Sequence, residues 1–348
     1  MDVLHFTSRK RESYQIKFTH SLLWEAALGI AAITNSSIIE TLDQPSEYWK
    51  NLKESLSKEM LAHLDFVEKN NTWKALLQVL QQKDFLTLSD FFTYLESLTE
   101  EELRYICIPY LGKMNQEIRS SAAHGNQESI RALTKIAEDI VFFPNYIEYI
   151  CTVDSNELKS HLSFVMQGWY GAVIEPKEEE LLAILARDMD TKIKMEQKMT
   201  SEELVEWATG GITYYPEPGV YQVLLIPQMV YRPWNIEADV EGVKVFFYPV
   251  ANDSIHPGDT YQPSNFLVHK YKALGDEVRL KIIKHLSEGS QSLQYITDKL
   301  EMGKSTIHHH LKILRSAKLV EIIDSKYALK REALNSIAKE LDYYLYEK

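Results

Sequence analysis

The sequence predicts a mostly helical α+β protein with a large N-terminal domain and a small C-terminal one. Three observations carry this prediction. Apolar residues recur every three or four positions through most of the first 210 residues. Residues 211–250 are instead rich in β-branched and aromatic residues, punctuated by proline and glycine, as short strands are. Further on, two short amphipathic helices are separated by a turn of about three residues.

Helices are expected along most of the first 210 residues. Start signals occur at Thr99, Asp154 and Thr200, whose side chains can accept hydrogen bonds from the free N–H groups of a first helical turn. Glu102 and Glu203 complete capping boxes at two of these positions. The expected helices cover residues 21–34, 46–68, 73–82, 89–97, 100–110, 127–141, 155–170 and 177–198.

Strands are expected between residues 211 and 250, at about 220–226, 231–236 and 243–248. The following segment, ANDSIHPGDTYQPSN, consists largely of turn formers and is predicted to be a linker. We therefore expect a sensor or assembly domain over residues 1–260, helical to about 210 and strand-rich over 211–250. A second domain is expected over residues 265–348.

The C-terminal domain should open with two amphipathic helices and a turn. A first helix over residues 271–286 would bury one stripe of apolar side chains, namely Leu274, Val278, Ile282, Ile283 and Leu286. Ser292 can cap the next helix, which would bury Leu293, Ile296 and Leu300. Residues 301–303 would form the turn.

The helix after this turn carries the chemistry expected of a DNA reader. Ile307, Leu311 and Leu314 should point inward, which leaves polar and basic side chains outside. Hydroxyls and imidazoles can bond to base edges, and lysine and arginine can contact phosphate or guanine. The free N–H groups of the helix start also favour phosphate. The expected DNA-binding residues are Lys304, Ser305, Thr306, His308, His309, Lys312 and Arg315, with Lys326 in the next hairpin.

Two further elements complete the predicted domain. Residues 319–323 and 326–329 read as a two-stranded wing around a turn at Asp324-Ser325. A last helix over residues 332–346 carries an apolar face that needs a partner. The expected dimerisation residues on this face are Leu334, Ile337, Leu341 and Leu345. Packing of this helix on the N-terminal domain of its own chain is the alternative.

With these residues in place, the C-terminal domain resembles the ArsR-type winged helix-turn-helix regulators. That family typically shows a pattern such as KALADPTRLRIL, followed by a helix such as SQSTVSHHLKVLREAGLV. The matching segments here are KALGDEVR at residues 272–279 and KSTIHHHLKILRSAKLV at 304–320. The resemblance implies a homodimer that reads an inverted repeat, with half-sites about one helical turn (~34–36 Å) apart.

Departures from the family pattern narrow what the resemblance implies. Many members sense metals through a Cys-x-Cys in the first helix of the reading motif, where this sequence has Leu293-Gln294-Tyr295. A thiolate metal sensor is therefore not expected. Glu301 replaces the usual glycine of the turn, and Gly303 replaces the usual serine cap. Lys326 is the wing's single cation, so we expect its minor-groove contact to be weak.

The N-terminal region resembles, more faintly, an uncharacterised domain found ahead of ArsR-type winged helices. The resemblance rests on three short segments: LLWE at residues 22–25, IPQ at 226–228 and FYP at 247–249. It supports a fused architecture and brings no known ligand.

Charge and composition fit a DNA-binding protein of the cytoplasm. The net charge is −12, but residues 270–348 contain 15 basic and 11 acidic side chains, so the remainder carries about −16. A basic module on an acidic body is expected where one domain faces phosphate. Two cysteines, Cys107 and Cys151, argue against a disulfide scaffold. The first 18 residues lack a signal-peptide pattern, and no membrane partner is expected.

Other chemistry is conceivable at four places, and a structural role is favoured at each. Consecutive helical residues point about 100° apart, so His308, His309 and His310 cannot jointly face one metal ion. Residues 178–180 read as the acidic first turn of a helix. Cys107 and Cys151 lie in apolar surroundings and are expected to be buried thiols. The aromatic residues favour core packing over a ligand pocket, namely Trp169, Tyr170, Trp207, Tyr214, Tyr215, Tyr231 and Trp234.

The sequence thus predicts a homodimeric, sequence-specific transcriptional repressor, with control by a small molecule at the N-terminal domain as a further expectation. No catalytic residue, metal ligand or cofactor is expected, and the protein is not expected to be an enzyme. Two alternatives stay open. The first is an N-terminal enzyme with a regulatory DNA-binding tail. The second is a winged helix that binds protein, which would favour an acidic or apolar face where residues 304–315 carry cations.

Overall fold

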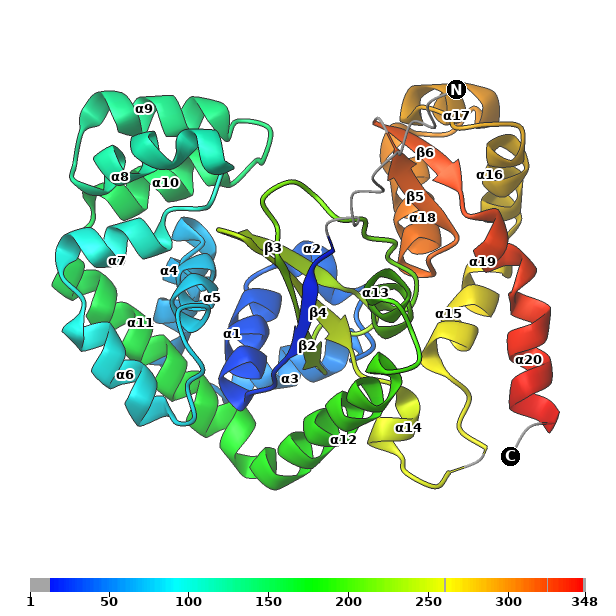
Figure 1. The fold of residues 1–348 in the computed structure, drawn as a ribbon, viewed down its shortest axis with the longest axis horizontal. Coiled ribbons are helices and arrows are strands. Elements are labelled where there is room, and N and C mark those ends of the chain that lie inside the picture. The colour runs from blue at the N-terminus through cyan, green and yellow to red at the C-terminus, as the bar shows by residue number, and fades with distance from the viewer. Residues whose placement is uncertain (1–12, 260, 324, 347–348) are drawn as a thin grey trace, which may run out of the picture.

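The computed structural model describes residues 13–259, 261–323 and 325–346. At its centre lies a four-stranded sheet with helices on both faces, and the C-terminal residues form a smaller body beside it (Figure 1). The mostly helical α+β class is thereby confirmed. Within the described ranges, no helix is long and apolar enough to cross a membrane.

The central sheet has the strand order β1–β2–β4–β3. β1 (Gln15–Phe18), β2 (Gln222–Gln228) and β4 (Val243–Pro249) run parallel, and β3 (Ile236–Val240) is antiparallel to β4. The strand expected at 231–236 is wrong. Tyr231 to Trp234 form a turn, closed by the Trp234 N–H donating to the Tyr231 carbonyl at 2.7 Å. Pro233 has no N–H for a strand ladder, which explains the difference.

The two faces of the sheet are covered by different helices. Val223 and Leu225 of β2 face α13 (Ser201–Thr209), together with Phe246 and Tyr248 of β4. The alternate positions face the opposite way, and Phe247 packs on Trp24 of α1 with ring centroids 5.2 Å apart. Both faces of β2 and β4 are therefore buried, so these strands read as continuous apolar runs.

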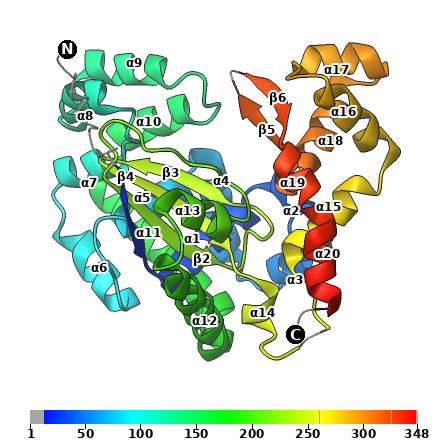
Figure 2. The ribbon, with the colours of Figure 1, turned by 45° about the vertical axis from the view of Figure 1, so that its right-hand side comes forward.

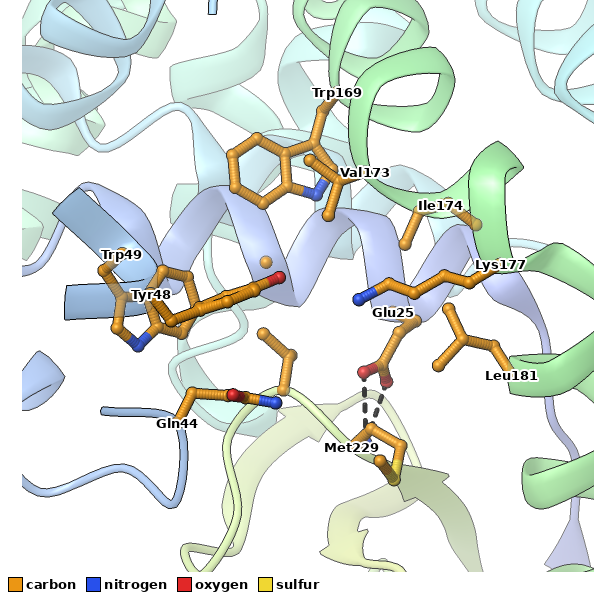
Figure 3. A pocket seen from close by; sticks show the side chains of 12 residues that line it. Glu25, Gln44, Tyr48, Trp49, Trp169, Val173, Ile174, Lys177, Leu181 and Met229 are labelled. Carbon is orange, nitrogen blue, oxygen red and sulfur yellow. Dashed lines mark hydrogen bonds between the residues drawn. The ribbon is translucent and has the colours of Figure 1, made fainter. Parts of the chain in front are cut away.

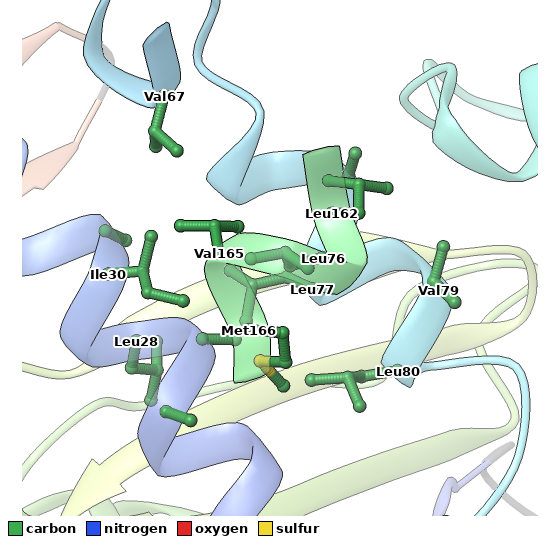
Figure 4. Close-up of a cluster of buried hydrophobic side chains, with 14 of the residues drawn as sticks. Leu28, Ile30, Val67, Leu76, Leu77, Val79, Leu80, Leu162, Val165 and Met166 are labelled. Atoms are coloured by element: carbon green, nitrogen blue, oxygen red, sulfur yellow. The ribbon is translucent and has the colours of Figure 1, made fainter. Parts of the chain in front are cut away.

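Helix α1 (Leu22–Ile33) is the central helix of the larger core. All twelve of its residues are buried, since LLWEAALGIAAI is apolar around its whole circumference apart from Glu25. It packs on α5 (Trp73–Leu80) and α11 (Ser155–Trp169). Figure 4 shows Ile30, Leu77 and Met166 from these three helices in one cluster. This core holds α1 rigidly, and Glu25 with it.

The other helices before residue 210 form the outer shell. Capping boxes are confirmed at Thr99 and Thr200, and Asp154 caps α11. The segment expected as one helix over 46–68 is two helices, because Ser57 starts a new one. The outer helices are α2 (Ser36–Ile39), α3 (Ser46–Ser55), α4 (Lys58–Asn70), α6 (Leu88–Ser97), α7 (Glu100–Cys107), α8 (Gln116–Ala123), α9 (Gln127–Ile136), α10 (Phe143–Thr152) and α12 (Glu178–Glu196).

The C-terminal body has its own hydrophobic core. Its elements are α15 (Asn265–Leu274), α16 (Glu277–Ser287), α17 (Leu293–Leu300), α18 (Lys304–Ser316), β5 (Val320–Ile323), β6 (Lys326–Leu329), α19 (Arg331–Asn335) and α20 (Ile337–Tyr346). The core side chains include Ile282, Ile296 and Leu311, each fully buried. No residue of this cluster belongs to the two N-terminal clusters.

Two predicted helices of this body are each broken in two. The helix expected over 271–286 stops at Gly275, and Asp276 caps α16 by accepting a hydrogen bond from the Arg279 N–H at 3.0 Å. The last helix breaks at Ser336, between α19 and α20. The predicted linker also contains structure, since α14 (Asn252–Ile255) buries Asn252 and Ser254 against the N-terminal part.

Lysines of the C-terminal body contact the N-terminal part. The Lys330 Nζ donates to the Gly211 carbonyl at 2.5 Å and lies 3.7 Å from a Glu206 oxygen. Lys318 is half-buried nearby, and desolvation lowers the pKa of its ammonium to about 8. Figure 2 shows α20 alongside α15, the helix that enters this body.

Candidate nucleic-acid interface

Helices α17 and α18 form a helix-turn-helix. Ser292 caps α17 as predicted, its hydroxyl accepting a hydrogen bond from the Tyr295 N–H at 3.1 Å. α17 ends at Glu301, whose φ of 53° is the left-handed conformation that glycine usually supplies. Gly303 then precedes α18. The turn is therefore built despite the unusual glutamate.

The faces of α18 agree with the prediction. Ile307, Leu311 and Leu314 are fully buried in the core of the C-terminal body. The exposed side chains of the helix include Lys304, Ser305, Thr306, His308, His309 and Arg315. Six predicted DNA-binding residues thus lie on the solvent side of one helix.

The three consecutive histidines divide between solvent and core. His308 and His309 are exposed, whereas His310 turns toward Asp276, with Nδ1 3.6 Å from a carboxylate oxygen. Burial lowers the pKa of the His310 imidazole, although Asp276 opposes this. The Arg279 N–H holds the pKa of the Asp276 carboxyl below its usual value. His310 thus belongs to the support of α18, and the two exposed imidazoles are free for a ligand.

Lys312 is placed differently from the other predicted phosphate contacts. Its Nζ lies 5.6 Å from the centroid of the Trp234 ring in the N-terminal part, and burial lowers the pKa of the ammonium. An ammonium over an indole face is held by the ring quadrupole, with about 0.5–2 kcal/mol. Lys312 would therefore have to leave Trp234 to reach a phosphate.

The wing is a two-stranded antiparallel hairpin, as predicted. Val320 pairs with Leu329 and Ile323 with Lys326, and Lys326 is exposed. A bridge from Gln291 to Tyr327 ties the hairpin to the start of α17. The predicted turn residue Asp324 lies outside the described residues.

The predicted dimerisation residues are split between the core and the surface. Ile337 is buried and Leu334 packs against the same core. Leu341 is half-buried, and Leu345 is 54% exposed beside the 79% exposed Tyr346. α20 also packs on α15, where Lys270 and Glu340 form an ion pair at 2.6 Å. Packing within the chain therefore covers part of the apolar face of α19 and α20, and the C-terminal end of α20 stays exposed.

Arg279 is a supporting residue of the reading helices that the sequence prediction did not single out. Its guanidinium donates to the carbonyls of Ala273 and Lys272 at 2.6 and 3.0 Å, which ties the end of α15 to α16. The signal was present as Asp276, three residues earlier, since an aspartate cap marks a helix start.

The other residues at which chemistry was conceivable have structural roles. Cys107 and Cys151 are buried, and burial raises the pKa of their thiols to about 12 and about 11, so both are structural. Glu178, Glu179 and Glu180 form the first turn of α12, as predicted. Most of the singled-out aromatic residues pack in or against the cores. Trp169 also lines a cavity.

An exposed polar helix behind a tight turn, next to a β-hairpin wing, defines a winged helix-turn-helix. Residues 276–321 match the family described as "Bacterial regulatory protein, arsR family", so this part of the chain is an ArsR-type helix-turn-helix. The chain is also 46% identical over 52 residues to an uncharacterised HTH-type transcriptional regulator of Methanocaldococcus jannaschii. That match covers 15% of this chain and 58% of the relative. No solved structure matches the chain.

Proposed function

We propose that the protein is a sequence-specific DNA-binding transcriptional regulator that acts as a repressor. The observation that carries the proposal is the face of α18, where six polar or basic residues are exposed around a buried apolar stripe. B-DNA's major groove is about 12 Å wide and admits such a helix. The family match of residues 276–321 and the name of the relative support the same function.

The exposed residues divide by their position along α18. Lys304, Ser305, Thr306, His308 and His309 lie in the first half, the part of a recognition helix that reaches base edges. Arg315, Lys312 and Lys326 would contact phosphates on either side. The acidic remainder of the chain would repel the duplex and so favour this orientation.

Replacing Lys312 by alanine should weaken binding to all DNA sequences alike. Removing one lysine–phosphate ion pair should reduce the slope of log K against log salt by about 0.9. Fluorescence anisotropy across a salt series, on specific and random duplexes, measures both effects. Lys284→Ala is the matched control, because Lys284 is exposed on α16, away from the proposed contacts. An unchanged slope in Lys312→Ala would remove Lys312 from the interface.

We further propose that the protein is a homodimer that reads an inverted repeat. The exposed end of α20, with Leu345 and Tyr346, supplies an apolar surface that a second copy would cover. Equivalent surfaces of two copies would then meet around a two-fold axis, matching the symmetry of an inverted repeat.

Leu345→Asp should convert the dimer to a monomer, because a carboxylate would be buried at the contact without a partner. Light scattering after gel filtration would show the mass fall from twice to once that of the chain, while Lys339→Ala on the same helix should stay dimeric. A wild-type protein that is monomeric at micromolar concentration would contradict the dimer.

We also propose that the N-terminal part binds a small effector, and we assign no reaction to it. This proposal is supported by the contact between the N-terminal part and α15 of the C-terminal body. There Asp43 lies 3.3 Å from the His269 Nε2 and 3.2 Å from the Arg232 Nε. A ligand that shifts Asp43 or Arg232 would thereby act directly on the helix that enters the reading domain.

A further inference from the structure

A small cavity lies where the buried helix α1 meets the loop after β2 and the junction of α11 and α12. Its volume is about 50 Å³. Residues 170–174 of the junction form a π-helical turn. Such turns are rare and are frequently found at functional sites. The lining side chains come from four segments that are distant in sequence, and Figure 3 shows them around one space.

Two buried polar side chains line the cavity. Glu25 is 4% exposed, and both of its carboxylate oxygens accept from the Met229 N–H, at 3.0 and 3.1 Å. Trp169 is 1% exposed, and its Nε1 has no hydrogen-bond partner among the described residues. Gly29 makes room for this indole, since a Cβ at that position would lie 2.7 Å from the Trp169 Nε1.

The mouth of the cavity is formed by longer polar side chains. Figure 3 shows the Lys177 amine, the Tyr48 hydroxyl and the Gln44 amide directed toward the space above Glu25. The Lys177 Nζ lies 5.8 Å from the centroid of the Tyr48 ring. Among the described residues, the Lys177 Nζ and the Glu25 carboxylate oxygens do not come within the 4.0 Å of an ion pair. The ammonium therefore acts on the Glu25 carboxylate from beyond ion-pair distance, without a bond to it.

Donors outnumber acceptors among the groups that still lack a partner here. The Trp169 N–H is buried without an acceptor, and the half-buried Lys177 ammonium has no ion pair among the described residues, whereas Glu25 is already held by a backbone N–H. A buried donor left unsatisfied costs about 1–3 kcal/mol, and a bound acceptor would recover this. An anionic oxygen is therefore the ligand group that would best satisfy the two donors.

We propose that this cavity binds the carboxylate of a small organic acid, with Lys177 and Trp169 as its donors. About 50 Å³ is a third of the roughly 150 Å³ that encloses benzene, so the carboxylate alone would fit inside. The rest of the molecule would lie at the mouth, against Tyr48 and Gln44. The inference refines the effector role proposed above, yet the site can be tested without DNA.

The cavity is linked to the reading domain by one short segment. Met229 binds Glu25, and three residues later Arg232 contacts Asp43 through both its side chain and its carbonyl, which accepts from the Asp43 N–H at 2.8 Å. Asp43 in turn contacts His269 of α15. A carboxylate placed beside Glu25 would act on this segment first.

The test follows the Trp169 indole N–H by NMR. The protein contains six tryptophans, so ¹⁵N-indole labelling gives few signals. The signal of Trp169 is the one that is missing from the spectrum of Trp169→Phe. Acetate and benzoate are the probes, and methylammonium is the control of opposite charge. We expect both acids to shift the Trp169 signal with millimolar Kd, benzoate more tightly because its ring can contact Tyr48.

Two matched variants decide whether the cavity is the site. Lys177→Met should weaken both acids at least tenfold, whereas Lys194→Met, which changes an exposed lysine near the end of α12, should leave Kd unchanged. Either no shift of the Trp169 signal up to about 50 mM acid, or equal Kd values in Lys177→Met and wild type, would overturn the proposal. Both readouts are independent of DNA, so a failure of the regulator proposal would be recognised separately.

Binding should also depend on pH through Glu25. Burial raises the pKa of this carboxyl to about 7, while the Met229 and Val230 N–H groups and Lys177 oppose the shift. A neutral Glu25 repels a carboxylate less, so affinity should rise by up to about tenfold from pH 8 to pH 6. Glu25→Gln keeps an acceptor for Met229 and should show a flat profile. A flat wild-type profile would place the acid away from Glu25.

Discussion

Replacing His308 and His309 together by alanine is expected to reduce the preference for the operator over random DNA by about a hundredfold. Both imidazoles are exposed on the first half of α18, beside the fully buried Ile307 and Leu311 that fix the helix. Removing the hydrogen bond of one imidazole to a base should cost about 1–3 kcal/mol, and removing both should cost at least a hundredfold in affinity when each is worth about 1.4 kcal/mol. Anisotropy titrations on operator and random duplexes measure the difference.

The salt dependence separates base reading from phosphate contact in this variant. Because the two histidines are proposed to contact bases and not phosphates, the salt slope should stay at the wild-type value. His124→Ala is the matched control, since His124 is exposed on the N-terminal part and far along the chain from α18. A double variant that still prefers its operator as strongly as the wild type does would show that α18 is not the reading helix.

Asp188→Ala is expected to lower the free energy of unfolding by about 3–5 kcal/mol. Asp188 is fully buried in α12, and one oxygen accepts from the Ala251 N–H at 2.8 Å and from the Ser254 hydroxyl at 2.9 Å. Its other oxygen lies 3.7 Å from the Nζ of the buried Lys192. Removing the carboxylate leaves that ammonium without its anion and frees α14, which leads to the reading domain.

A second substitution distinguishes this cause from general damage to the core. Asp188→Ala with Lys192→Met removes both charges, and it should recover part of the loss because an apolar replacement of a buried ion pair is often close to neutral. Urea unfolding measures all variants, with Asp190→Ala, exposed on the same helix, as the control. If the double variant were no more stable than Asp188→Ala, the unpaired ammonium could not be the cause.

Local signals made the reading domain and several helix starts of the N-terminal part predictable. Ser292, Thr99 and Thr200 are caps because a side-chain oxygen and the following N–H groups lie within three residues of one another. The buried stripe of Ile307, Leu311 and Leu314 follows from helical geometry alone. The break at Gly275-Asp276 was also present in the sequence as a cap, but the continuous apolar stripe hid it.

Features that depend on distant pairing could not be predicted in the same way. β1 has only four residues, and its strand exists because Gln15 pairs with Gln222, about 200 residues away. The contact of Lys312 with Trp234 depends on how the N-terminal part and the C-terminal body meet. The sequence around Lys312 therefore gave no sign that this side chain differs from the exposed residues of α18. The cavity at Glu25 and Trp169 likewise needs four separate segments to be brought together.

The most direct test of the central claim is binding of the full chain to its own upstream DNA across a salt series, with random DNA alongside. We predict binding to the upstream fragment that falls steeply with salt and is at least a thousandfold tighter than on random DNA at physiological salt, as is typical of specific regulators. Equal, weak binding to both duplexes at every salt concentration would contradict the claim that this protein is a sequence-specific regulator.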